Sequence, residues 1–184
     1  VDLFTASGHK IHGPKGVGVL YIKKGVTIKP LITGGGQEKN MRSGTEAVPL
    51  IYGLKGAVDS LGNINENLKN TGKLWQYAKQ TLLESGFVSV NSHEDGLPFI
   101  LNISVEGYRS ETLLHFLEAQ GVYVSSGSAC AKGEGSYVLR EMGLGKKAVD
   151  SALRISLSRY NTKDDVDALK SALIDATQKL RRSN

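Results

Sequence analysis

The sequence has little of several features, and each shortage excludes a class of protein. A single cysteine, Cys130, excludes an intramolecular disulfide, and with only four scattered histidines it gives no zinc-finger spacing. No apolar run reaches the roughly 18 residues that a membrane span needs. No secretory leader is recognisable either. We therefore expect a cytoplasmic protein without a metal site and without a membrane partner.

Glycine is abundant instead, with 22 residues among 184. They show neither a collagen-like period nor a long Gly/Ser tract, so fibres and flexible linkers are excluded. The content of hydrophobic residues, 40%, with 22% charged residues, is typical of a globular protein. The net charge of +5 is spread along the chain, and it does not by itself indicate a nucleic-acid partner.

Short β-branched runs between glycines predict strands, and apolar residues at helical spacing predict helices. The strands are expected at 1–5, 17–22, 28–32, 87–90, 99–105, 122–125 and 153–158. The helices are expected at 45–61, 63–83, 110–121 and 137–142, with a last helix capped by Asn161 or Thr162. Strands that alternate with helices indicate an α/β or α+β architecture.

The first segment that could carry chemistry is a glycine-rich turn around Lys10. The string SGHKIHGPKGVG places Lys10 between two predicted strands. An amine at the end of a buried strand is partly desolvated, which favours the neutral nucleophile that Schiff-base chemistry needs. Ser7, His9 and bare backbone amides are suited to a phosphate, although Pro14 breaks the P-loop pattern. The alternative is a plain hairpin with an exposed lysine.

The only cysteine lies in a segment of small residues. Residues 125–136 read SSGSACAKGEGS, a composition that packs poorly and moves easily. Beside Lys132, an exposed Cys130 thiol would ionise more readily and act as a nucleophile. A lone cysteine is equally often a small buried hydrophobe, and the composition leaves both interpretations open.

Arg154 lies in the alternating run LRISLS, residues 153–158. The three apolar side chains are expected on one face of a strand, and Arg154 with two serines on the other. A guanidinium forms a planar, bidentate pair with a carboxylate, which is a usual way to bind an amino acid. A surface salt bridge is the alternative.

The fourth segment, GGGQEKNMRSGTE, spans residues 34–46. Three consecutive glycines imply unusual backbone angles or close backbone approach. Arg42, Ser43 and Thr45 just before a predicted helix suit an anion. A simple helix N-cap by Ser43 or Thr45 would explain the end of the segment equally well.

Taken together and in this order, the four segments resemble the pyridoxal-phosphate-dependent cysteine desulfurases of the class V aminotransferase group. The family's cofactor-lysine segment resembles SGHKIHGPKGVGVLYI, and its next signature resembles GGGQEKNMRSGTEAVP. The family's catalytic cysteine loop resembles SSGSACAKG, and its substrate-binding strand resembles ALRISLSRYNT. The resemblance implies an α/β, fold-type-I pyridoxal phosphate transferase. Residues 1–50 would be the C-terminal part of the large cofactor domain, and residues 51–184 linking helices and a small α+β C-terminal domain.

The resemblance also implies roles for individual residues. Lys10 would bind pyridoxal 5'-phosphate (PLP) covalently and move protons, and Ser7 and His9 would contact its phosphate. Thr45 would contact the phosphate of the neighbouring subunit's cofactor, which implies a homodimer. Arg154 would bind the carboxylate of L-cysteine.

Cys130 would then attack the substrate sulfur, keep it as a persulfide and release L-alanine. The sulfur would pass to an acceptor protein, either an iron–sulfur scaffold or a tRNA-thiolation enzyme. Two alternatives stay open: a selenocysteine lyase or other class V aminotransferase, and a non-catalytic fragment that retains only the acceptor-docking surface.

Two departures from the family qualify these expectations. Family members are considerably longer, and the N-terminal half that contacts the pyridine ring has no counterpart in this sequence. We therefore expect a C-terminal portion that is inactive alone, its N-terminal half being a separate chain or missing. The segment between Cys130 and Tyr137 is also shorter than in the housekeeping iron–sulfur members, and Asn40 stands where glycine is common, which leaves the acceptor open.

Overall fold

The computed structural model describes residues 1–126 and 136–182. The chain divides into two compact units, Val1–Ile64 and Asn65–Asn184, which we call the first and the second unit. None of the helices within the described ranges has the length and apolar character needed to cross a membrane. The domain boundary expected after residue 50 concerns the complete enzyme and stays a prediction.

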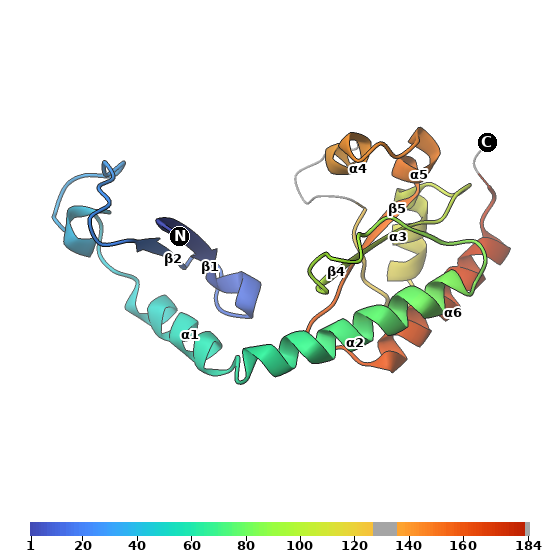
Figure 1. Ribbon diagram of the computed structural model, residues 1–184, viewed down its shortest axis with the longest axis horizontal. Coiled ribbons are helices and arrows are strands. Elements are labelled where there is room, and N and C mark those ends of the chain that lie inside the picture. Colours follow the sequence, from blue (N-terminus) through green and yellow to red (C-terminus); the bar gives the residue numbers. More distant parts are fainter. Residues whose placement is uncertain (127–135, 183–184) are drawn as a thin grey trace. The chain divides into compact units, whose positions relative to one another are not determined.

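The first unit is a β-hairpin followed by a long irregular segment and a helix (Figure 1). Its elements are β1 (Leu3–Ser7), the 3₁₀ turn η1 (Gly8–Ile11), β2 (Gly18–Ile22), a second 3₁₀ turn η2 (Glu38–Asn40) and α1 (Val48–Asp59). The two strands are antiparallel, with Leu3 opposite Ile22 and Ser7 opposite Gly18. The expected strands at 1–5 and 17–22 are therefore confirmed to within two residues.

The first unit buries very little. Gly8, Ser43 and Ala57 are its only buried residues. Every residue of β1 is exposed, and Phe4 and Leu20 keep 55% and 49% of their surface. Since neighbouring residues of a strand point to opposite faces, both faces of the hairpin carry uncovered apolar side chains.

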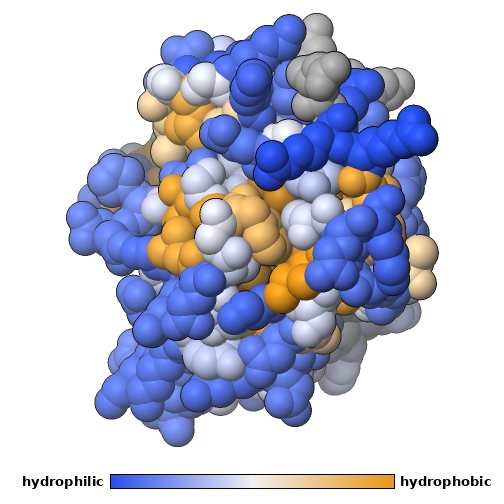
Figure 2. Space-filling view, turned by 90° about the vertical axis from the view of Figure 1, so that its right-hand side faces the viewer, coloured by the Kyte–Doolittle hydropathy of each residue, from blue (hydrophilic) through white to orange (hydrophobic). Residues whose placement is uncertain are grey.

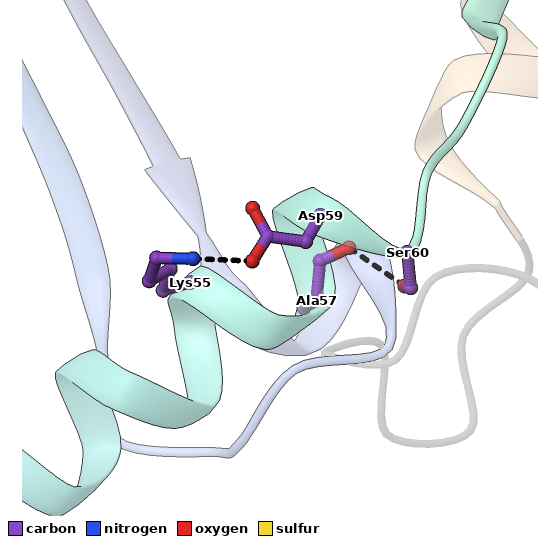
Figure 3. Close-up of polar contacts among 4 residues, drawn as sticks. All are labelled: Lys55, Ala57, Asp59 and Ser60. Atoms are coloured by element: carbon purple, nitrogen blue, oxygen red, sulfur yellow. Dashed lines mark hydrogen bonds and ion pairs between the residues drawn. The ribbon is translucent and has the colours of Figure 1, made fainter.

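Helix α1 packs against the turn that follows β1. A Cβ added to Gly53 would lie 2.4 Å from a Pro14 carbon, and one added to Gly13 would lie 3.2 Å from Ala57. Glycine is therefore needed at position 53 for this close approach, and a side chain at position 13 would be tightly crowded. The last turn of α1 is closed by an ion pair between Lys55 and Asp59 and by the Ser60 hydroxyl (Figure 3), which donates to the carbonyl of Ala57.

The second unit is a three-stranded antiparallel sheet with helices on both faces, in the strand order β3–β4–β5. Its strands are β3 (Ser89–Val90), β4 (Ile100–Ser104) and β5 (Ala152–Ser156). Its helices are α2 (Ile64–Leu83, which begins at the last residue of the first unit), α3 (Ser110–Glu118), α4 (Tyr137–Glu141), α5 (Lys146–Asp150) and α6 (Lys163–Lys179).

The alternation of side chains in β4 and β5 produces the core of the second unit. Leu101, Ile103 and Leu153 are fully buried and pack with residues of α2, α3 and α6. Ala152, on the other face, packs in a smaller cluster with Leu139 of α4 and Val149 of α5. The molecular face in Figure 2 is mainly hydrophilic, with apolar side chains visible near its centre.

The structure corrects two of the predicted elements and adds a helix that was not predicted. Residues 28–32 form no strand, because Pro30 has no N–H to donate to a ladder. Residues 122–125 make only an isolated bridge, between Ser125 and Arg154, in place of a strand. Helix α5 was not predicted, since its five residues are too few for a helical period to stand out.

Candidate active site

The turn around Lys10 gathers three of the predicted site residues. Ser7 ends β1, and His9 and Lys10 lie in η1. All three are exposed, and no ion pair or side-chain hydrogen bond engages them within residues 1–126 and 136–182. The expectation of a partly desolvated Lys10 at the end of a buried strand is wrong for this chain, because β1 is exposed along its whole length. The hairpin with an exposed lysine is what the structure has.

The backbone of this turn is nevertheless fixed. The buried Gly8 donates its N–H to the carbonyl of Val17 at 2.9 Å, and the N–H of Gly13 donates to the carbonyl of Gly8 at 2.9 Å. His12 ends the turn in the left-handed region, with a φ of 65°. Together with the packing of Gly13 and Pro14 on α1, these bonds hold the stem from which Lys10 projects.

Thr45 follows a loop that is closed on itself. The Gly44 N–H donates to the Gln37 side-chain oxygen at 3.1 Å, and the Ser43 N–H donates to the carbonyl of Ile32 at 3.1 Å. Arg42 is exposed, and its Nη1 donates to the carbonyl of the next residue, Ser43, at 3.0 Å. Ser43 is buried by these contacts, whereas Thr45 is exposed.

The helix-capping alternative for this segment is wrong. Helix α1 begins at Val48 with Ala47 as its N-cap residue and proline in its first turn, because proline fits the first positions of a helix. Ser43 and Thr45 thus lie outside the helix. The loop contains three consecutive residues in the left-handed region, Glu38–Asn40, which is a strained arrangement of the kind found at functional sites.

Arg154 occupies the middle of β5 in the second unit. Its backbone exchanges two hydrogen bonds with Ser125, at 2.6 and 3.1 Å. Its Nε is buried without a hydrogen-bond partner, and no ion pair engages its guanidinium in the part of the chain that the structure describes. An unpaired guanidinium that is partly desolvated favours an anion, because burial strengthens the attraction and leaves the Nε–H unsatisfied.

Cys130, the predicted nucleophile, lies outside the described residues. The flanks of its loop are described: Ser125 pairs with Arg154, and Ser136 caps α4 by accepting the N–H of Leu139 at 3.4 Å. Arg154 is therefore hydrogen-bonded to a residue five positions before Cys130. Lys10 and Thr45 belong to the first unit and Arg154 to the second, and each is described within its own unit.

A set of polar residues beside Arg154 was not predicted. Asn91, Asn102 and Ser104 are joined by side-chain hydrogen bonds on the face of the sheet that carries Arg154. The available signal was Asn102 and Ser104, two polar residues in the mainly apolar run FILNISV. Across 1–126 and 136–182, no three His, Cys, Asp or Glu side chains are grouped so that they could hold a metal ion.

Comparison with known proteins identifies the family. The chain matches the aminotransferase class-V family over residues 1–169. The chain belongs to the class-V aminotransferase family. It is 40% identical over 185 residues to the cysteine desulfurase IscS of Methanosarcina thermophila, covering 98% of this chain and 46% of that protein.

Solved structures agree with this assignment. A NifS-like protein superposes with a TM-score of 0.87 at 37% identity, covering 98% of this chain and 47% of the other. The NifS-like protein of Rickettsia africae superposes with a TM-score of 0.85 at 34% identity, over 97% and 48%. The α/β, fold-type-I architecture predicted from the sequence is thereby confirmed. The chain spans about half the length of the relatives it matches.

Class-V aminotransferases depend on PLP, and the residues of the Lys10 turn fit one end of that cofactor. Lys10 offers an exposed amine, and Ser7 and His9 offer a hydroxyl and an imidazole within three positions of it. An amine suits the aldehyde of PLP and the other two groups suit its phosphate.

Proposed function

We propose that this chain is the C-terminal part of a PLP-dependent cysteine desulfurase. The observation that carries the proposal is Arg154, whose partly buried guanidinium has no partner in the described part of the chain and whose backbone is bonded to the segment leading to Cys130. A cation of this kind binds the α-carboxylate of an amino acid. The proposed nucleophile, Cys130, lies five positions after Ser125, the residue whose backbone is bonded to Arg154.

The reaction balances without an outside oxidant. The Cys130 thiolate attacks the sulfur of L-cysteine, so that an S–S bond forms and the C–S bond breaks. The electron pair of the C–S bond stays on carbon, which takes up a proton and leaves as L-alanine. The thiol of Cys130 is thereby converted to a persulfide.

Lys10 has two tasks in this proposal. Its amine would hold PLP covalently, and the free amine would move protons to and from the substrate. PLP, when bound, supplies an electron sink that weakens the bond between the β-carbon and the sulfur. Ser7 and His9 bind the phosphate, and the fixed backbone of the turn orients all three side chains.

Thr45 binds the cofactor phosphate of a second subunit, so the enzyme is a homodimer. Two contacts support this role: the Gln37 side chain accepts the N–H of Gly44, and Arg42 donates to the carbonyl of Ser43. Thr45 itself is exposed at the end of this loop, where a neighbouring subunit can reach it.

The enzyme is completed by an N-terminal half, on the same polypeptide or on a separate one. The uncovered faces of the β1–β2 hairpin support this part of the proposal, because an isolated two-stranded ribbon with apolar residues on both faces is marginal in water. We call this chain together with that half the assembled enzyme. It works in the cytoplasm and passes sulfur to an iron–sulfur scaffold or to a tRNA-thiolation enzyme.

The test is the release of sulfide and L-alanine from L-cysteine by the assembled enzyme, with a thiol reductant to discharge the persulfide. Cys130→Ala should abolish sulfide release while keeping the visible absorbance of bound PLP, and Lys10→Ala should abolish both. Lys24→Ala, an exposed lysine beyond β2, is the matched control and should change neither. Sulfide release that survives Cys130→Ala would contradict the proposal, and activity with selenocysteine alone would indicate a lyase.

A further inference from the structure

Asn102 lies directly opposite Arg154 in the β4–β5 pair. The hydrogen bond from Leu157 to Phe99 marks one bonded position of this ladder. Since bonded and non-bonded pairs alternate, Asn102 and Arg154 form a non-bonded pair. Side chains at such pairs are the closest in a sheet, with Cβ atoms about 4.5 to 5.5 Å apart. The two side chains therefore share one face at short range.

A chain of hydrogen bonds fixes which way the neighbouring amides are turned. Ser104, fully buried, donates its only hydroxyl proton to the carbonyl of Ala148 at 2.7 Å. Its oxygen must then accept from Asn91, whose Nδ2 lies 2.8 Å away. The direction of both bonds follows from the backbone carbonyl, which can only accept.

The same logic orients Asn102. The second N–H of Asn91 Nδ2 donates to Asn102 Oδ1 at 2.8 Å. Asn102 therefore presents its oxygen to Asn91 and its NH₂ group away from Asn91. No hydrogen bond to a described residue engages that NH₂ group, and Nδ2 is not among the buried unpartnered atoms. Its donors thus stay open to a ligand.

Two sets of unused donors consequently meet on this face of the sheet. Arg154 contributes a guanidinium with a buried, unpartnered Nε, and Asn102 contributes a pre-oriented amide. The backbone of Asn102 is itself held, because its N–H donates to the Ser92 hydroxyl at 2.8 Å. A planar group with two acceptor oxygens matches both donors, and a carboxylate is such a group.

We propose that Asn102 is a second carboxylate-binding residue, which acts with Arg154 and selects substrates with a free α-carboxylate. The inference rests on the proposed function, in which Arg154 binds L-cysteine. Asn102 donates from Nδ2 to the carboxylate, and Asn91 and Ser104 hold that amide in the donating orientation. The residue discriminates against amides, because an amide nitrogen in place of a carboxylate oxygen meets only donors.

The first experiment uses nuclear magnetic resonance on the 184-residue chain, with L-alanine and L-alaninamide as the probes. L-Alanine should shift the side-chain NH₂ signals of Asn102 and the Nε–H signal of Arg154 with one common concentration dependence. L-Alaninamide should shift neither. Shifts at Arg154 without shifts at Asn102, or no shift at either residue, would overturn the proposal.

The second experiment measures kcat and KM for L-cysteine in the assembled enzyme. Asn102→Ala should raise KM by about tenfold to a hundredfold, as expected for the loss of a hydrogen bond to a charged group, and leave kcat nearly unchanged. Asn102→Asp should raise KM further, because its carboxylate pairs with Arg154 and repels that of the substrate. Asn70→Ala, an exposed asparagine of α2, should change neither constant.

Different results would contradict the proposed function and the role of Asn102. A wild-type assembled enzyme that releases no sulfide contradicts the proposed function. A wild-type enzyme that is active, is disabled by Arg154→Ala and keeps its KM in Asn102→Ala contradicts only the role of Asn102. A merely structural role of Asn102 predicts a lower melting temperature with an unchanged preference for L-alanine over L-alaninamide, which also overturns the proposal.

Discussion

The two units of the chain differ in how much they bury. The second unit encloses a continuous core in which Leu101, Ile103 and Leu153 are inaccessible to solvent, whereas the first unit buries only Gly8, Ser43 and Ala57. A domain is stabilised mainly by apolar burial, so the second unit has the means to fold on its own. The first unit has well-defined turns without a core to hold them.

The difference separates two kinds of site residue. Arg154 and Asn102 are set in the sheet of the self-sufficient second unit, so their carboxylate site is expected in this chain without any partner. Lys10, Ser7, His9 and Thr45 project from the exposed first unit, so their site is expected to form fully only when the hairpin is covered. The chain thus carries a carboxylate site that is complete in the second unit and a cofactor site that is incomplete in the first unit.

The largest expected contrast is between two leucines. Leu153→Ala should lower the free energy of unfolding by about 2 to 5 kcal/mol, because it leaves a cavity in the core of the second unit. Leu20→Ala, on the exposed hairpin, should change it by no more than about 0.5 kcal/mol. Urea unfolding followed by circular dichroism measures both. Equal losses would mean that the hairpin belongs to the cooperative core.

A smaller effect is expected at the start of α6. Thr162 and Asp165 form a capping box, and the Thr162 N–H donates to the Asp165 carboxylate at 2.9 Å. Thr162→Ala should cost about 1 kcal/mol in the free energy of unfolding of the second unit. The matched variant Thr45→Ala, in the first unit and outside any helix, should leave the free energy of unfolding unchanged.

The same cap should be sensitive to acid. The backbone N–H of Thr162 and then the side chain of Asn161 hold the pKa of Asp165 below its usual value. A lowered pKa in the folded state means that the cap's contribution is complete above the unfolded value, about 3.9, and is lost as the pH falls through the folded value. Asp165→Asn should remove this part of the pH dependence of unfolding, and an unaltered acid limb would contradict it.

The smallest effect is expected in the loop before Thr45. Gln37→Ala removes the acceptor of the Gly44 N–H, so exchange of that amide should accelerate by about fivefold, the equivalent of roughly 1 kcal/mol. The melting temperature of the second unit should not move. The control for both measurements is Gln76→Ala, at an exposed glutamine of α2. A lowered melting temperature of the second unit in Gln37→Ala would contradict this prediction, because it would show coupling between the units.

The parts of the fold with a strong period were predictable from the sequence. The helices at 48–59 and 64–83 and the alternating strand around Arg154 follow from apolar spacing. The helix at 163–179 follows from the capping residues before it. The false strand at 28–32 came from counting apolar residues across Pro30, which cannot join a ladder. Helix α5 is too short for any period to be seen in its sequence.

The site was predictable only in part, for a similar reason. Short sequence motifs surround Lys10, Thr45 and Arg154, and such motifs can be recognised from the sequence alone. Asn91, Asn102 and Ser104 are separated by up to 13 positions and meet only through the sheet, so their joint role depends on the strand register. The exposure of β1 was not predicted, because the sequence of a short apolar strand does not show whether other elements pack on it.

Hydrogen exchange of the 184-residue chain tests the contrast between the two units most directly. The ladder amides of Leu101 and Leu153 in the second unit should exchange at least about a thousandfold more slowly than those of Phe4 and Tyr21 in the hairpin, since only the former require unfolding of a core. In the assembled enzyme the hairpin amides should become protected as well. Equal and strong protection of the hairpin in the chain alone would contradict the account.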